Sequence, residues 1–145
     1  MRTVNKSALV PYTAQQMYAL VNDVLRYPEF LPWCRRAQIL SHNDTEMRAS
    51  LEMARAGLHK IFTTHNHLQP GQAIVITLED GPFRHLRGHW QFEDLGPEGS
   101  KVALKMEFEF AGALLDLMVG PVFHEICNSL VDAFTRRALD LYGKR

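Results

Sequence analysis

Apolar and polar residues alternate without interruption between residues 102 and 110. Even positions are all apolar and odd positions are small or charged, with Val102, Leu104, Met106, Phe108 and Phe110 set against Ala103, Lys105, Glu107 and Glu109. Residues 85–95 show the same period of two, with Leu86, Gly88, Trp90 and Phe92 on one side, and residues 74–78 show it more briefly. This pattern predicts β-strands that bury one face and expose the other.

Further strands are predicted at residues 2–10, which end before Pro11, and at 46–56 and 58–68, on either side of Gly57. The period of two begins near Arg35. Turn-forming residues separate the predicted strands at 42–44, 69–71, 80–82 and 96–99, where Asn, Asp, Gly and Pro are concentrated. Short turns between consecutive strands predict an antiparallel meander of about seven strands.

Three segments are predicted to be helical. Thr13 is suited to cap a short helix at 14–22. A second short helix or turn follows at 24–31, where Pro28 and Pro32 limit its length. The segment 114–142 has apolar residues three, four or seven apart, the spacing of one helix face: Leu115, Met118, Val122, Ile126, Leu130, Phe134 and Leu141. Gly120-Pro121 is expected to kink or break this helix near its start.

This order of elements predicts one α+β domain over residues 1–145, a curved antiparallel sheet around a long C-terminal helix, with two short helices after the first strand. A single helix is roughly 10 Å wide, which is narrower than such a sheet. Either large side chains fill the remaining space or an apolar cavity is left, the usual form of a ligand site. The residues expected to line it are Phe62, Trp90, Phe92, Met106, Phe108 and Phe110 from the sheet and Met118, Val122, Phe123 and Ile126 from the helix.

Large apolar residues also gather in one predicted loop, between residues 27 and 33. The loop holds Tyr27, Phe30, Leu31 and Trp33, and it is stiffened by Pro28 and Pro32. Phe83 directly follows the turn at 80–82. Two interpretations stay open: these residues plug the core, or they form a lid at the mouth of the cavity or a membrane-facing patch.

The charge balance argues against a general nucleic-acid binder. The chain has 16 basic and 16 acidic residues, so its formal net charge is zero, whereas such binders usually carry a basic excess. A local basic patch stays open, and the adjacent basic pairs are Arg35/Arg36, Arg136/Arg137 and Lys144/Arg145. The chain opens on polar residues and has no apolar stretch near the roughly 20 residues of a membrane span, so we expect a cytoplasmic protein, with contact at the membrane surface left open.

No familiar catalytic or metal-binding set is found. His65 and His67 share a face of a predicted strand, opposite the apolar set, and a metal site there would need a third ligand. His124 and Cys127 lie three apart on the predicted helix, without the HExxH spacing or an oxyanion site. Cys34 and Cys127 form no metal motif. We therefore expect no metal, no cofactor and no enzymatic activity, and an enzyme would need a buried polar group with a strongly perturbed pKa.

Several motifs along the chain resemble the START-like superfamily. The opening Ala8-Leu9-Val10-Pro11-Tyr12 and the run Tyr27-Pro28-Glu29-Phe30-Leu31-Pro32-Trp33-Cys34 carry the resemblance, together with Asp80-Gly81-Pro82-Phe83 and Gly88-x-Trp90-x-Phe92. The chain is most similar to the bacterial ribosome-association toxin branch, which is related to the mitochondrial coenzyme Q-binding proteins. The resemblance covers essentially the whole chain.

This resemblance implies the helix-grip fold with an apolar cavity between the sheet and the long helix. The coenzyme Q branch implies a polyprenyl quinone (ubiquinone) as the bound ligand, carried or presented for respiration, and this is our first hypothesis. The bacterial branch implies binding to the large ribosomal subunit and a block of its joining to the small subunit. In that alternative Arg35, Arg36, Arg136 and Arg137, with Lys144 and Arg145, are the candidate RNA contacts.

Overall fold

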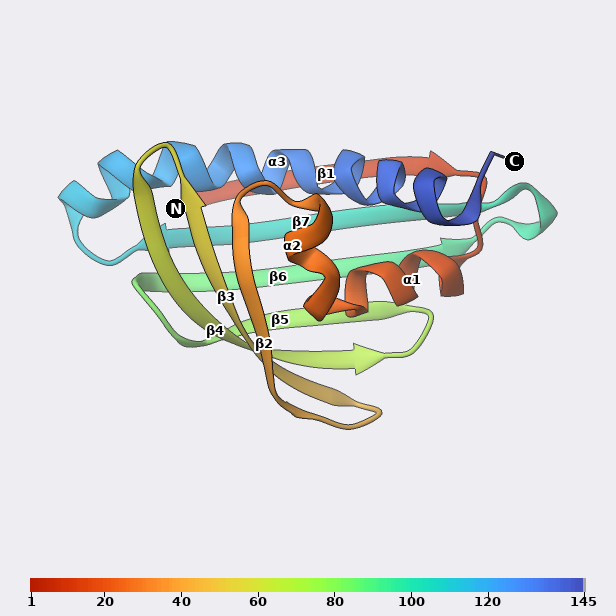
Figure 1. Ribbon diagram of the computed structural model, residues 1–145, viewed down its shortest axis with the longest axis horizontal. Coiled ribbons are helices and arrows are strands. Elements are labelled where there is room, and N and C mark those ends of the chain that lie inside the picture. The colour runs from red at the N-terminus through yellow and green to blue at the C-terminus, as the bar shows by residue number, and fades with distance from the viewer. Residues whose placement is uncertain (145) are drawn as a thin grey trace.

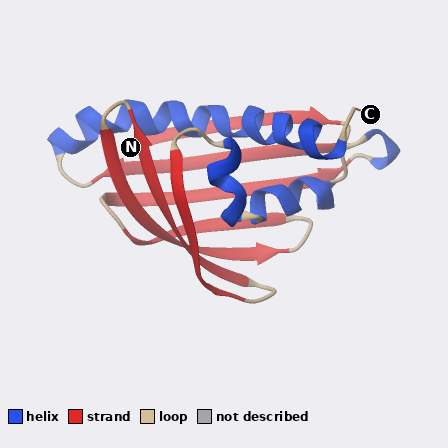
Figure 2. Ribbon diagram, viewed as in Figure 1, coloured by secondary structure: helices blue, strands red, loops and turns tan. Residues whose placement is uncertain are grey.

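Strands make up most of the first 110 residues in the computed structural model, which describes residues 1–144 (Figure 1, Figure 2). The seven strands are β1 (Arg2–Val10), β2 (Cys34–His42), β3 (Glu46–Arg55), β4 (Leu58–Gln69), β5 (Ala73–Asp80), β6 (Phe83–Asp94) and β7 (Ser100–Phe110). They form one antiparallel sheet in the order β1-β7-β6-β5-β4-β3-β2. The predicted meander is confirmed, and Figure 1 shows that β2, β3 and β4 curve away from the other strands.

The short helices follow β1 as predicted. They are α1 (Ala14–Asn22), the 3₁₀ turn η1 (Val24–Arg26) and α2 (Tyr27–Phe30), and a further 3₁₀ turn, η2 (Gly96–Glu98), precedes β7. Thr13 caps α1 through a reciprocal pair of hydrogen bonds. Thr13 Oγ1 accepts from the Gln16 amide at 3.0 Å, and Gln16 Oε1 accepts from the Thr13 amide at 2.9 Å. This capping box satisfies two amide groups that the first helical turn leaves free.

The C-terminal helix α3 (Ala113–Tyr142) lies along the concave face of the sheet and contacts β1 and β7 (Figure 1). It runs without a break through Pro121, so the predicted break is wrong. Pro121 removes one helical hydrogen bond to the Leu117 carbonyl group. Both residues are exposed, and water can therefore solvate that carbonyl.

By length and composition α3 could also cross a membrane, contrary to the expectation from the sequence. Here it is the core helix of the domain, and its buried face includes Phe123, Ile126, Leu130 and Phe134. The strand residues that face it are the even positions of β7 and, in β6, Leu86, Gly88, Trp90 and Phe92, which are all buried as predicted. One layer of sheet and one long helix therefore enclose the interior.

Candidate functional site

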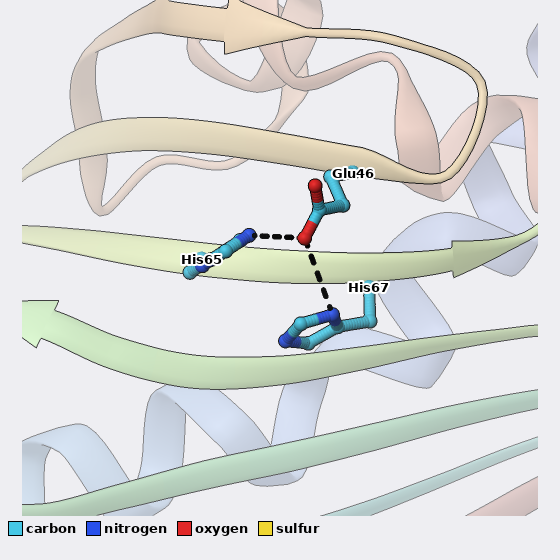
Figure 3. Close-up of side chains that lie close together, drawn as sticks. All are labelled: Glu46, His65 and His67. Carbon is cyan, nitrogen blue, oxygen red and sulfur yellow. Dashed lines mark hydrogen bonds and ion pairs between the residues drawn. The ribbon is translucent and has the colours of Figure 1, made fainter.

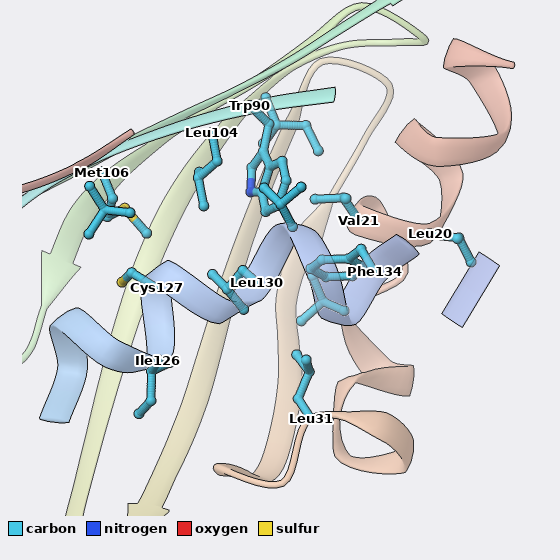
Figure 4. Close-up of a cluster of buried hydrophobic side chains, with 14 of the residues drawn as sticks. Leu20, Val21, Leu31, Trp90, Leu104, Met106, Ile126, Cys127, Leu130 and Phe134 are labelled. Carbon is cyan, nitrogen blue, oxygen red and sulfur yellow. The ribbon is translucent and has the colours of Figure 1, made fainter. Parts of the chain in front are cut away.

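A cavity of about 70 Å³ lies between the concave face of the sheet and α3. Its walls come from five strands, from α3 and from the segment between α1 and β2. The lining residues are Val24, Tyr27, Trp33, Ala49, Leu51, Phe62, Thr64, Asn66, Ile76, Leu86, Trp90, Met106, Phe123, Ile126, Cys127, Leu130 and Phe134. In Figure 4, Trp90 and Met106 approach from the strands, whereas Ile126, Cys127, Leu130 and Phe134 belong to α3.

Five of the residues predicted to line a cavity do so. They are Phe62, Trp90 and Met106 from the sheet and Phe123 and Ile126 from α3. Phe92, Phe108 and Phe110 are buried but do not border the cavity. The Phe108 ring lies 4.8 Å from that of Phe123, and the Phe110 ring stacks on Phe83 at 4.3 Å. The sequence left two alternatives for the space between the sheet and α3, a solid core or a cavity. Aromatic side chains fill much of this space, and a small cavity remains.

The predicted position of Met118 in the cavity is wrong, because this side chain is 58% exposed. Val122 is half-buried and does not border the cavity either. The helix turns Val119 and Phe123 toward the interior instead, and each neighbouring residue points about 100° away. Figure 1 shows the first turns of α3 extending past the ends of β1 and β7, where no strand covers them.

The proline-stiffened segment is part of the wall. Leu31 and Trp33 are 1% and 5% exposed, and Phe83 is equally buried. The Tyr27 hydroxyl donates to the Val21 carbonyl, and Phe30 lies half-buried against Phe134. The exposed residues of this segment are Pro28, Glu29 and Pro32. The geometry thus favours packing against the core over a loose lid.

Two polar groups in the cavity were not predicted. Thr64 and Asn66 are buried on β4, and Thr64 Oγ1 donates to Asn66 Oδ1 at 3.0 Å. The buried Nε1 of Trp33 has no hydrogen-bond acceptor within residues 1–144. Thr64 and Asn66 lie two and four residues after Phe62 on the same strand, so all three side chains point to the same face of the sheet. This spacing could have predicted that Thr64 and Asn66 point inward. The cavity is apolar with a small polar patch on one wall.

Tyr27 and Cys127 are the titratable groups among the described residues that line the cavity. Among the described residues, no carboxylate, histidine, lysine or arginine side chain lines it. Burial strongly raises the pKa of the Cys127 thiol, and burial raises the pKa of Cys34 to about 11. A thiol reacts through its thiolate form, so both cysteines are held in their unreactive state. Within the described part of the chain, no hydrogen bond joins His124 to Cys127.

One arginine of each predicted arginine pair has an acidic partner. Arg137 pairs with Glu29 at 2.8 Å and lies 4.8 Å above the Phe30 ring, and Arg35 lies 3.7 Å from Glu52. Arg36 and Arg136 are exposed, without an ion pair to any described residue. Lys144 is exposed as well, and Arg145 lies outside the described residues.

A second basic surface lies on the convex face of the sheet. It is a hollow of about 350 Å³ over β1, β7 and β6, lined by Asn5, Lys6, Ser7, His89, Gln91, Lys101, Ala103, Leu104 and Lys105. Three lysines border it, and no acidic residue among those described lines it. Lys105 also pairs with the neighbouring Glu107 at 3.3 Å. We call this surface the lysine hollow.

The chain is similar to known proteins over almost all of its length. The family described as polyketide cyclase/dehydrase and lipid transport matches residues 10–135. A Vibrio cholerae protein named Ribosome association toxin RatA is 47% identical over 144 residues, which cover 99% of this chain and 100% of that protein. The mitochondrial Coenzyme Q-binding protein COQ10 homolog B of Xenopus laevis is 28% identical over 145 residues, or 97% of this chain and 59% of that protein.

Among solved structures, the Zhui aromatase/cyclase from Streptomyces superposes with a TM-score of 0.84 over 99% of both chains. Its sequence identity to this chain is 21%. This likeness establishes the helix-grip fold, and among the described residues half-buried Tyr27 and buried Cys127 are the titratable groups that line the cavity.

Proposed function

We propose that this chain, which belongs to the polyketide cyclase/dehydrase and lipid transport family, is a cytoplasmic ribosome-association factor. It would bind the large ribosomal subunit and block its joining to the small one. The observation that carries this proposal is the 47% identity to a ribosome association toxin over 99% of this chain and 100% of that protein. The coenzyme Q-binding relative is more distant, and this chain spans only 59% of it.

The size of the cavity supports a surface function over carriage of a quinone. An engineered protein cavity of about 150 Å³ binds benzene, and the cavity here is less than half that volume, at about 70 Å³. A ubiquinone ring carries methoxy, methyl and isoprenoid substituents and is larger than benzene. It would fit only after buried residues such as Trp33 or Phe123 had moved.

Ribosomal RNA is a polyanion, and the lysine hollow is the surface that offers it the best match. Lys6, Lys101 and Lys105 supply positive charge, and Asn5, Ser7 and Gln91 supply hydrogen-bonding groups beside them. Phosphate contacts of this kind position a protein on RNA. The exposed Arg36 and Arg136 are a second candidate surface.

Sedimentation tests the proposal directly. Purified large and small subunits are mixed at a magnesium concentration that supports joining, with and without a molar excess of the protein, and separated on a sucrose gradient. We expect the joined ribosome peak to shrink and the protein to migrate with the large subunit. An unchanged profile, with the protein left at the top of the gradient, would contradict the proposal.

A second candidate function is binding of a small apolar ligand that carries a hydrogen-bond acceptor. The observation that favours it is the unpartnered Nε1 of Trp33 at the wall of an apolar cavity that also holds Asn66. Organic extraction and mass spectrometry of the protein purified from its native host would detect such a ligand. Cys127→Leu adds volume at the cavity wall, so it should abolish loading of a true cavity ligand and leave ribosome binding unchanged.

A further inference from the structure

Three potential metal ligands converge on the convex face of the sheet. They are Glu46 at the start of β3 and His65 and His67 on β4 (Figure 3). His65 Nε2 lies 3.1 Å from Glu46 Oε1, and His67 Nδ1 lies 3.8 Å from the same oxygen. From sequence alone the two histidines share a face but lack a third ligand. The pairing of β3 with β4 supplies it, because Glu46 is the cross-strand partner of His67.

The backbone around Glu46 is fixed by the turn between β2 and β3. Asn43 Oδ1 accepts hydrogen bonds from the amides of Thr45 and Glu46, each at 3.0 Å. The Asn43 amide in turn donates to the Glu46 carbonyl at 2.9 Å. His65 and His67 lie on a paired strand, with their rings stacked at 4.6 Å between centres. All three side chains therefore project from anchored backbone.

The separations suit a tetrahedral zinc ion. Bonds of about 2.0–2.1 Å from zinc to nitrogen and oxygen place neighbouring ligand atoms roughly 3.3 Å apart. The two measured separations from Glu46, 3.1 and 3.8 Å, bracket this value. All three ligand atoms lie within 4.8 Å of one another. A rotation of the imidazole rings is therefore enough to bring both nitrogen atoms and the carboxylate oxygen to the separations of a zinc site. Two imidazoles and one carboxylate are a common zinc ligand set.

We propose that Glu46, His65 and His67 bind one Zn²⁺ ion on the convex face of the sheet. All three side chains are partly exposed, at 47%, 33% and 51%, so an ion reaches them without any opening of the fold. Three protein ligands leave a coordination position for water or an exchangeable ligand, which distinguishes this site from a closed structural one.

The neighbouring charges permit a cation here. Arg48 is the cross-strand partner of His65 and is the nearest fixed positive charge along the register. Its guanidinium group is held by both carboxylate oxygens of Glu79, at 2.5 and 2.6 Å. This bidentate pair neutralises Arg48 and directs it toward β5, so the carboxylate of Glu46 stays available for the metal.

The chain contains a matched control for this site. His59 Nε2 lies 3.2 Å from Glu52 Oε1, which reproduces the same histidine–carboxylate contact between the same two strands. There the described residues provide no second histidine. His89 is a further control, since it shares the row of His67 but lies beyond Val75, roughly 10 Å away at the usual strand spacing.

Isothermal titration of the tag-free, chelator-treated full chain with ZnCl₂ tests the proposal. We expect one ion per chain and a loss of affinity of more than tenfold in each of His65→Ala, His67→Ala and Glu46→Gln. Substitution with Co²⁺ should give the visible absorption of a tetrahedral site, and His67→Ala should remove it. His59→Ala and His89→Ala should bind zinc like the unsubstituted chain.

Circular dichroism and the melting temperature establish that each variant is folded, which exposed positions should tolerate. The absence of zinc binding to the unsubstituted chain would overturn the proposal. So would equal losses in His59→Ala and His67→Ala, since they would indicate diffuse binding by surface histidines. Neither result depends on whether the protein binds ribosomes.

Discussion

Gly99 allows the turn before β7 to pass over the end of β1. Its φ angle is +138°, and a Cβ atom there would lie 2.0 Å from the carbonyl oxygen of Val10. The nearest atoms to this Cβ are backbone atoms of Val10 and Pro11, so no side-chain rotation can relieve the clash. We expect Gly99→Ala to lower the free energy of unfolding by roughly 3 kcal/mol, the upper end of the usual range for a strained backbone residue, as measured by urea denaturation.

Gly96 is the matched control for this prediction, in the same connection between β6 and β7. Its φ angle is +83°, but a Cβ atom there would have no neighbour within 4 Å. Gly96→Ala should therefore lose only the left-handed conformational preference, about 1–2 kcal/mol. Equal losses at the two positions would show that the Val10 carbonyl contributes nothing.

The buried pair of Thr64 and Asn66 gives a second prediction at this scale. Thr64→Val removes the only hydroxyl that donates to Asn66 Oδ1 in the described structure, and an unsatisfied buried acceptor costs about 1–3 kcal/mol. Thr64→Val/Asn66→Leu removes both partners, and the added volume of Leu enters the cavity beside it. Urea denaturation should show the double variant to be more stable than Thr64→Val alone. The reverse order would mean that the polar pair stabilises the fold.

At the scale of elements, most of the fold could be predicted because its signals are local. Alternation in β7 depends only on neighbouring residues, and the cap of α1 joins Thr13 to Gln16, three positions away. Turn residues marked the strand ends for the same reason. Phe62 also indicates which face of β4 points inward. Thr64 and Asn66 lie on that face, but their polar side chains give no indication in the sequence that they are buried.

Helix α3 shows where local signals end. Its apolar spacing predicted Met118 and Leu141 on the buried stripe, yet both are exposed, and Val119 and Phe123 are buried instead. The helix has apolar residues on more than one side near its start, so spacing alone admits more than one buried face. The curvature and width of the sheet decide which face is covered, and these depend on pairing between strands far apart in sequence.

The size of the cavity is a property of the whole molecule. It depends on how the rings of Phe62, Phe83, Phe110 and Phe123 interlock across three strands and α3, with neighbouring centres 4.3–6.0 Å apart. The sequence identified Phe62, Phe110 and Phe123 as large and inward-facing and Phe83 as a residue of the cavity mouth, but it did not give the volume left between them. The same limit holds for Glu46, His65 and His67, which only the strand register brings together.

The distribution of charge is also a property of the whole molecule. The net charge is zero, but positive and negative side chains are unevenly distributed over the surface. Sequence adjacency drew attention to Arg35/Arg36 and Arg136/Arg137, but Glu52 and Glu29 partly neutralise these pairs. The lysine hollow is assembled from three strands and has no acidic lining residue among those described, and of its three lysines Lys105 pairs with Glu107 at 3.3 Å. If the protein binds ribosomal RNA, the hollow should contribute more phosphate contacts than either arginine pair.

Salt dependence of binding to the large subunit distinguishes these surfaces. Each lost phosphate contact should lower the slope of log K against log salt concentration by about 1, because fewer counterions are released on binding. We expect Lys101→Gln/Lys105→Gln to reduce the slope by about 2, with weaker binding at every salt concentration. Arg35→Gln/Arg36→Gln and Arg136→Gln/Arg137→Gln serve as comparison variants of equal charge loss. A reduced slope in one arginine variant alone would place the interface at that arginine pair, on β2 or on α3. An unchanged slope in all three variants would mean that none of these basic surfaces contacts phosphate.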